Sequence, residues 1–139
     1  MTTTPSESDG LVRTATFGWG GARAALGVVA LLDPVRVSRP WIGDDAERTG
    51  ALVFARALGG RDLALGAGAM FAAGRGEPIR AWALAGSAAD LGDTLITCAY
   101  RGRLPRGRRA FIAGLAGGSA VLGVALALAE RGRDRRGLS

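Results

Sequence analysis

A stretch of twenty residues without an ionisable side chain, AFIAGLAGGSAVLGVALALA at 110–129, constrains the fold of this chain more than any other feature. A helix needs about 20 predominantly apolar residues to cross the hydrocarbon core of a bilayer. A soluble amphipathic helix of this length would carry a polar face, and this stretch carries none. It therefore predicts a membrane-spanning helix.

Three further apolar segments, at about 15–33, 50–73 and 80–100, approach the same length. Pro, Gly and Arg residues separate them, and the connections after the second and third segments are short, so consecutive helices should be antiparallel neighbours. With 139 residues there is room for one domain. The predicted fold is all-α: an integral membrane four-helix bundle with short polar loops, one of which covers residues 34–45.

Both ends of the chain differ from this central region. Residues 1–14 begin with the polar MTTTPSESDG, which lacks the charged-then-apolar order of a signal peptide and predicts a disordered tail. Residues 130–139 are rich in arginine and predict a basic C-terminal tail. We therefore predict a transmembrane domain over 15–129 between two tails.

All 18 basic residues are arginines, and the formal net charge is +6. They cluster at 101–109 and 131–136, on either side of apolar segments. Arginines in such positions are typical of contacts with anionic lipid headgroups, so we expect a multi-pass protein of the cell (plasma) membrane and no nucleic-acid partner. The two membrane faces carry nearly equal numbers of arginines, which leaves the orientation open.

Six charged side chains fall inside the predicted spans: Arg23, Arg56, Arg61, Asp62, Asp90 and Asp93. Counting 1.5 Å per residue from the span centres places four of them near mid-bilayer and the other two toward one surface. Each costs roughly 2.5–3.5 kcal/mol when inserted without a partner. We therefore predict three ion pairs inside the bundle: Arg61 with Asp90, Arg56 with Asp93, and Arg23 with Asp62.

Two interpretations of this cluster remain open. Such a network can be structural, fixing the register and orientation of the helices. Alternatively, Asp90 or Asp93 binds a proton or a ligand in a cavity, because ionisable groups inside membranes are functional candidates by default.

Small residues predict the helix-packing faces. Gly60, Ala64, Gly68 and Ala72 recur at every fourth position, and Gly114 and Gly118 form a GxxxG pattern. Such stripes let helix backbones approach closely in lipid, and they are compatible with a homo-oligomer or a membrane-protein partner.

Catalytic and metal-binding patterns are lacking. The chain has no histidine and one cysteine, Cys98, so a zinc site and an internal disulfide are not expected. Without histidine, no serine of the chain can belong to a Ser-His-Asp triad. The glycine-rich GAGAM at 66–70 lacks the Lys-Ser/Thr of a phosphate-binding loop. We therefore predict no catalytic residue, no metal and no cofactor.

The segments RALGGRDLALGAGAMFA (56–72) and AADLGDT (88–94) resemble small four-helix membrane proteins of the DoxX-like group over about residues 20–128. That group has no settled activity, so the resemblance implies a fold and a membrane location rather than a reaction. The sequence favours a non-enzymatic accessory or scaffold subunit of a membrane assembly. The main alternative is a small proton-coupled transporter that uses Asp90 or Asp93. A third interpretation, a membrane enzyme with redox or lipid chemistry, is supported by the resemblance only.

Overall fold

The computed structural model of the chain describes residues 7–104 and 109–136, and every regular element among them is a helix. This part of the fold prediction, an all-α chain, is confirmed. The elements are α1 (Glu7–Leu32), α2 (Pro34–Ile42), the 3-10 helix η1 (Gly43–Glu47), α3 (Thr49–Arg75), α4 (Arg80–Ala99) and α5 (Arg109–Arg136).

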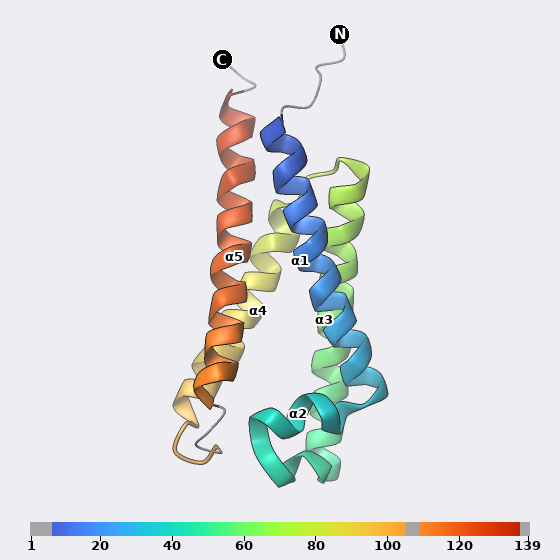
Figure 1. Cartoon of the computed structure of the whole chain (residues 1–139), viewed down its shortest axis with the longest axis vertical. Helices are drawn as coiled ribbons and strands as arrows, with labels where there is room; N and C mark the ends of the chain where they lie inside the picture. The colour runs from blue at the N-terminus through green and yellow to red at the C-terminus, as the bar shows by residue number, and fades with distance from the viewer. Residues whose placement is uncertain (1–6, 105–108, 137–139) are drawn as a thin grey trace.

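The four long helices form two pairs (Figure 1). α1 packs along α3 and α4 packs along α5, and fewer contacts join one pair to the other. The start of α1 and the end of α5 lie at one end of the molecule, and α2 and η1 lie at the other (Figure 1). The two pairs are close together near the chain ends and separate toward α2.

Glycines bring the backbones of α1 and α3 into contact. A Cβ atom on Gly27 would lie 2.5 Å from the backbone nitrogen of Leu63, and one on Gly20 would lie 2.8 Å from the carbonyl oxygen of Gly66. A Cβ atom on Gly59 would lie 2.9 Å from the carbonyl oxygen of Gly27. The glycines on each helix are seven residues apart, about two turns, so the antiparallel helices meet at two levels.

The predicted packing stripe on α3 is wrong for Gly60 and Ala64 and confirmed for Gly68 and Ala72, of which Ala72 is buried in the core. A Cβ atom on Gly60 would find nothing within 4 Å, and Ala64 is exposed, whereas Gly68 lies against the ring of Trp82. Contacts between α1 and α3 repeat every seven residues, through Gly59 and Gly66, rather than every four.

The GxxxG pattern on α5 also does not pack within the chain. Cβ atoms on Gly114 and Gly118 would find nothing within 4 Å. α5 approaches α4 through Gly123 instead, where a Cβ atom would lie 3.0 Å from the carbonyl oxygen of Ala83. The predicted glycines face an open space between the helix pairs, described below.

The predicted N-terminal tail is wrong for residues 7–14, which belong to α1; residues 1–6 lie outside the described part of the chain. Val12 packs against the small core that contains Ala72 and Ile79. The guanidinium of Arg13 donates to the carbonyl oxygen of Gly76 at 2.9 Å, in the turn after α3. These contacts explain why the helix begins before the apolar segment does.

The predicted C-terminal tail is wrong for residues 130–136, which continue α5; residues 137–139 lie outside the described part. Glu130 is buried, and its carboxylate accepts a hydrogen bond from the backbone N–H of Ile79 at 2.8 Å. This N–H sits just before α4, where a helix leaves donors without partners. Residue 130 therefore belongs to the folded core.

Residues 34–45 form a helix and a 3-10 turn rather than the predicted loop. The side chain of Asp33 caps α2 by accepting from the backbone N–H of Arg36 at 3.0 Å, and Pro34 occupies the first helical position. α2 ends at Gly43, whose φ of 68° suits glycine. The Asp-Pro pair was a helix-start signal.

Two described helical segments are long and apolar enough to cross a membrane: Asp9–Leu32 and Ala113–Arg131. α3 and α4 have 27 and 20 residues, which is sufficient length. Their arginines and aspartates lower their hydropathy, and four of them, Arg61, Asp62, Asp90 and Asp93, belong to the candidate site.

Candidate functional site

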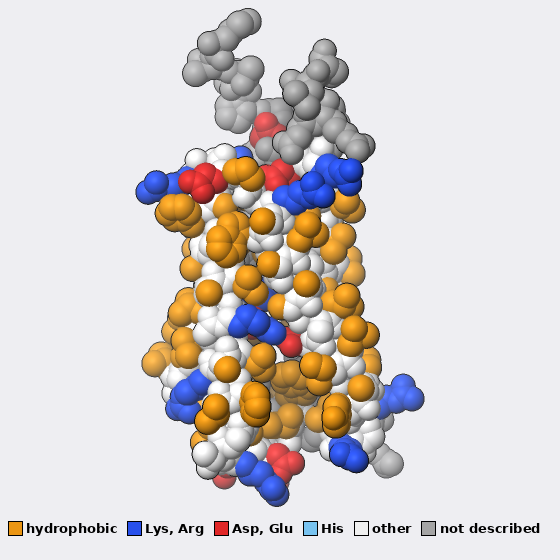
Figure 2. Space-filling view, turned by 180° about the vertical axis from the view of Figure 1, so that it is seen from behind, with side chains coloured by type: hydrophobic (Ala, Val, Ile, Leu, Met, Phe, Trp, Pro, Cys, Tyr) orange, Lys and Arg blue, Asp and Glu red, His pale blue; other side chains and the backbone are white. Residues whose placement is uncertain are grey.

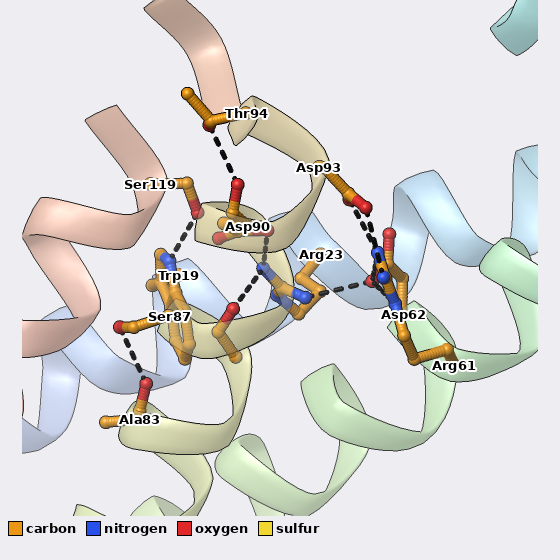
Figure 3. Close-up of polar contacts among 11 residues, drawn as sticks. Trp19, Arg23, Arg61, Asp62, Ala83, Ser87, Asp90, Asp93, Thr94 and Ser119 are labelled. Atoms are coloured by element: carbon orange, nitrogen blue, oxygen red, sulfur yellow. Dashed lines mark hydrogen bonds and ion pairs between the residues drawn. The ribbon is translucent and has the colours of Figure 1, made fainter. Parts of the chain in front are cut away.

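Arg23 of α1 is the centre of an ion network half-way along the helices (Figure 3). Its Nη1 lies 2.9 Å from Asp62 Oδ1 on α3, and its Nη2 forms an ion pair with Asp90 Oδ1 on α4. Nη2 also donates to the carbonyl oxygen of Gly86 at 3.3 Å. One buried guanidinium therefore links three helices.

Arg61 of α3 forms the second half of the network. Its Nη1 and Nη2 contact the two oxygens of Asp93 at 3.3 and 2.8 Å, which is a bidentate pair. Nη2 lies 3.1 Å from Asp62 Oδ1 as well. The side chains of Arg61 and Asp93 are 31% and 21% exposed, so this half lies at the edge of the bundle.

Of the three predicted pairs, the one between Arg23 and Asp62 is confirmed. The predicted pair of Arg61 with Asp90 is wrong, because Arg61 contacts Asp93, one turn further along α4. Asp90 contacts Arg23 instead.

Arg56 does not join the network, so its predicted pair with Asp93 is also wrong. Its Nε donates to the carbonyl oxygen of Leu31 at 3.2 Å on the exposed side of α3. Arg56 and Arg61 are five residues apart and hence about 140° apart around the helix. Arg56 is therefore kept out of the network by its direction around α3 rather than by its depth along the helix.

Trp19 connects the network to α5. The guanidinium of Arg23 lies over its ring, 5.2 Å from the centroid, which is cation–π geometry. The indole Nε1 donates to Ser119 Oγ at 3.0 Å (Figure 3). Trp19 was not among the residues predicted for the site. The available signal was its spacing of four residues from Arg23, which puts both side chains on one helical face.

The network contains more carboxylates than guanidiniums. Asp62, Asp90 and Asp93 share two arginines, which gives a formal charge of −1. Two buried atoms of the network have no hydrogen-bond partner among the described residues, Asp90 Oδ2 and Arg23 Nε. The site therefore has unused acceptor and donor capacity as well as excess negative charge.

A cavity of about 890 Å³ extends from the network toward α2, between the two helix pairs. Figure 2 shows the molecule hollowed on this side, toward the end where α2 lies. Asp90 and Asp93 contribute to one end of the cavity, and Arg36 and Trp41 of α2 contribute to the other. The indole nitrogen of Trp41 is buried and has no partner in the described structure. Apolar side chains and both GxxxG glycines line the rest, among them Leu26, Val29, Leu58, Gly114, Gly118 and Leu122.

No group of three or more His, Cys, Asp and Glu side chains within residues 7–104 and 109–136 could hold a metal ion. Cys98 is a free, exposed thiol near the end of α4. The described side chains of the site offer charge pairing, hydrogen bonding and apolar contact.

No family model matches the chain, and neither a curated protein nor a solved structure matches it. The resemblance to DoxX-like proteins stays a prediction.

Proposed function

We propose that the chain is a multi-pass protein of the cell membrane in which α1, α3, α4 and α5 cross the bilayer. The outward-facing apolar side chains carry this proposal. Large apolar residues project from all four helices, and some are largely exposed, such as Phe54 at 73% and Val121 at 71%. Figure 2 shows charged side chains at both ends of the molecule and, between them, a mostly apolar surface with one cluster of basic and acidic side chains at mid-height.

A water-soluble bundle would distribute these residues differently. Soluble helical proteins bury the apolar stripe of each helix and rarely expose apolar patches larger than a few hundred Å². In the most apolar 18-residue stretches of Asp9–Leu32 and Ala113–Arg131, only 33% and 28% of the residues are buried. Contact with lipid would satisfy these surfaces, and the arginines at the ends would meet anionic headgroups.

Within such a bundle, we propose that the network connects the two helix pairs. Arg23 contacts carboxylates on α3 and α4, and Arg61 contacts α4 from α3. Charged groups at this depth need internal partners, since lipid supplies none. This arrangement supports a non-enzymatic membrane subunit with an accessory or scaffold role, either as a homo-oligomer or beside a membrane-protein partner.

Membrane extraction tests the location. The full chain, expressed with a C-terminal tag, is expected to stay in the membrane pellet after an alkaline carbonate wash and to enter solution only with detergent. A peripheral membrane protein of similar size serves as the control that the wash releases. Release of this chain into the carbonate supernatant would refute the proposed location.

A second candidate, small proton-coupled transport, is favoured by one observation: the cavity is lined by Asp90 and Asp93. In this case Asp90→Asn should abolish the uptake of the transported substrate into proteoliposomes that a pH gradient drives. The abundance of the protein in the membrane should stay unchanged. A purely structural role predicts reduced abundance instead, because Arg23 would lose one of its two partners.

A further inference from the structure

We infer that the cavity binds a hydrophobic organic cation, a lipophilic ammonium, with the ammonium group against Asp90 and the apolar body between the two helix pairs. The inference rests on the proposed membrane location. It gives the cavity a substrate class, which the second candidate function leaves open.

Charge balance is the first support. The network has three carboxylates and two guanidiniums. Arg36 also lines the cavity, but it belongs to α2 at the opposite end. An excess negative charge in a low-dielectric environment is costly until a counter-charge arrives. One monovalent cation would make the network neutral.

The carboxylate of Asp90 supplies the second support. The residue is only 7% exposed and lines the cavity, and its Oδ1 contacts Arg23. The other oxygen, Oδ2, has no hydrogen-bond partner in the described structure. A buried acceptor without a partner costs about 1–3 kcal/mol. An ammonium N–H would supply both the missing hydrogen bond and the missing charge, whereas a neutral hydroxyl would supply only the hydrogen bond.

The shape and lining of the cavity are the third support. Its volume of about 890 Å³ lies in the range of small-molecule sites, roughly 300–1,000 Å³. Leu26 and Leu58 line it on the α1–α3 side and Leu122 lines it on α5, so the body of the ligand would be apolar. The rings of Trp19 and Trp41 also line it, and aromatic faces attract cations.

An anionic amphiphile is the main competitor, because Arg36 and the unpartnered indole N–H of Trp41 offer positive charge and a donor near α2. Binding there would leave the excess negative charge of the network uncompensated. The two ligand classes therefore make opposite predictions for probes that differ only in their polar group.

The test uses the full chain in mild detergent and isothermal titration with phenylbutylammonium, phenylbutanol and phenylbutyrate. We expect the ammonium to bind with one site per chain and at least about tenfold more tightly than the alcohol, a difference of about 1.4 kcal/mol. Equal binding of the ammonium and the alcohol, or tighter binding of the carboxylate, would overturn the inference.

Two matched pairs of variants locate the site. Asp90→Asn should remove the preference for the ammonium, whereas Asp45→Asn, on exposed η1, should keep it. Gly118→Leu should fill the cavity without touching the network, since a Cβ atom there finds nothing within 4 Å. Gly60→Leu adds the same side chain at a position of α3 that does not line the cavity, and this variant should bind normally.

If Asp90→Asn fails to fold, the comparison of Gly118→Leu with Gly60→Leu decides. A Gly118→Leu protein that binds the ammonium as tightly as the native chain would refute the cavity as the site. A chain that resists carbonate extraction but binds no ammonium would refute this inference alone. Release by carbonate would refute the membrane location on which the inference rests.

Discussion

The interface between α1 and α3 and the interface between the two helix pairs are built differently. In the first, glycines at two levels bring backbone against backbone. In the second, Arg23 and Arg61 contact Asp90 and Asp93 across the gap at mid-height, and a cavity lies toward α2. Toward the chain ends, an apolar cluster joins the two pairs through Trp19, Ala69, Ala83, Leu126 and Ala127. Backbone contacts at glycines therefore dominate the first interface, whereas charged and apolar side chains together form the second.

The largest effect is expected at Arg23, which pairs with Asp62 within the first interface and with Asp90 across the second. Arg23→Gln leaves Asp62 and Asp90 without their shared guanidinium, and breaking a buried ion pair costs about 3–5 kcal/mol. Unfolding of the purified chain in mixed micelles measures the loss. Arg39→Gln, which removes an exposed ion pair with Glu47, is the control and should cost at most about 1 kcal/mol. A similar small loss for both variants would contradict the structural importance of the network.

The next effect tests the glycine interface. Gly66→Leu would place a Cβ atom 2.5 Å from the backbone nitrogen of Ala24, where α1 cannot move without losing its other contacts. Overpacking of this kind lowers the free energy of unfolding by about 1–3 kcal/mol. We expect a loss at the upper end of this range, because the added side chain would meet backbone atoms. The same unfolding measurement applies, with Gly60→Leu as the matched control. Equal stability of the two variants would show that α1 and α3 are not in backbone contact.

A smaller effect is expected at the edge of the network. Arg61→Gln breaks the bidentate contact with Asp93, but both side chains are partly exposed and Asp62 keeps Arg23. We expect a loss of about 1 kcal/mol, well below that of Arg23→Gln. A loss of stability as large as that of Arg23→Gln would show that Arg23 is not the centre of the network and that Arg61 contributes equally.

The smallest effect is expected at Arg56, which tests whether depth along a helix or direction around it determines the ion pairs. Arg56→Gln removes a hydrogen bond to the carbonyl oxygen of Leu31 on an exposed face, so stability should change by no more than about 0.5 kcal/mol. A double variant with Asp93→Asn should show no coupling beyond the single changes. A measurable coupling energy would show that Arg56 and Asp93 interact, as the sequence predicted.

Depth along the helices was predictable from the sequence. The rise of 1.5 Å per residue places Arg23, Asp62 and Asp90 at one level, and the pair of Arg23 with Asp62 followed from it. Direction around each helix was not predictable, because helices that are apolar on most sides do not indicate which face turns inward. This explains the wrong partner of Arg61 and the stripe assigned to Gly60 instead of Gly59.

The remaining errors arose at the helix ends. Arg13 and Glu130 look like surface charges in the sequence, but both hydrogen-bond to backbone groups of the turn between α3 and α4. Such contacts depend on residues more than 50 positions away along the chain. Local composition therefore assigned these residues to tails. The cavity could not be predicted either, since it arises from the angle between the helix pairs.

The central claim is that lipid surrounds the four long helices at the level of the network. Water accessibility at that level tests it most directly. In a Cys98→Ser background, Leu91→Cys places a thiol beside Asp90 on the outer face of α4, where Leu91 is 53% exposed, and Gly102→Cys places one in the turn after α4. A membrane-impermeant maleimide is applied to opened native membranes without detergent. We predict that the thiol at 102 reacts rapidly and the thiol at 91 reacts only after detergent is added. Equally fast reaction at both positions in untreated membranes would show that water, rather than lipid, surrounds the bundle.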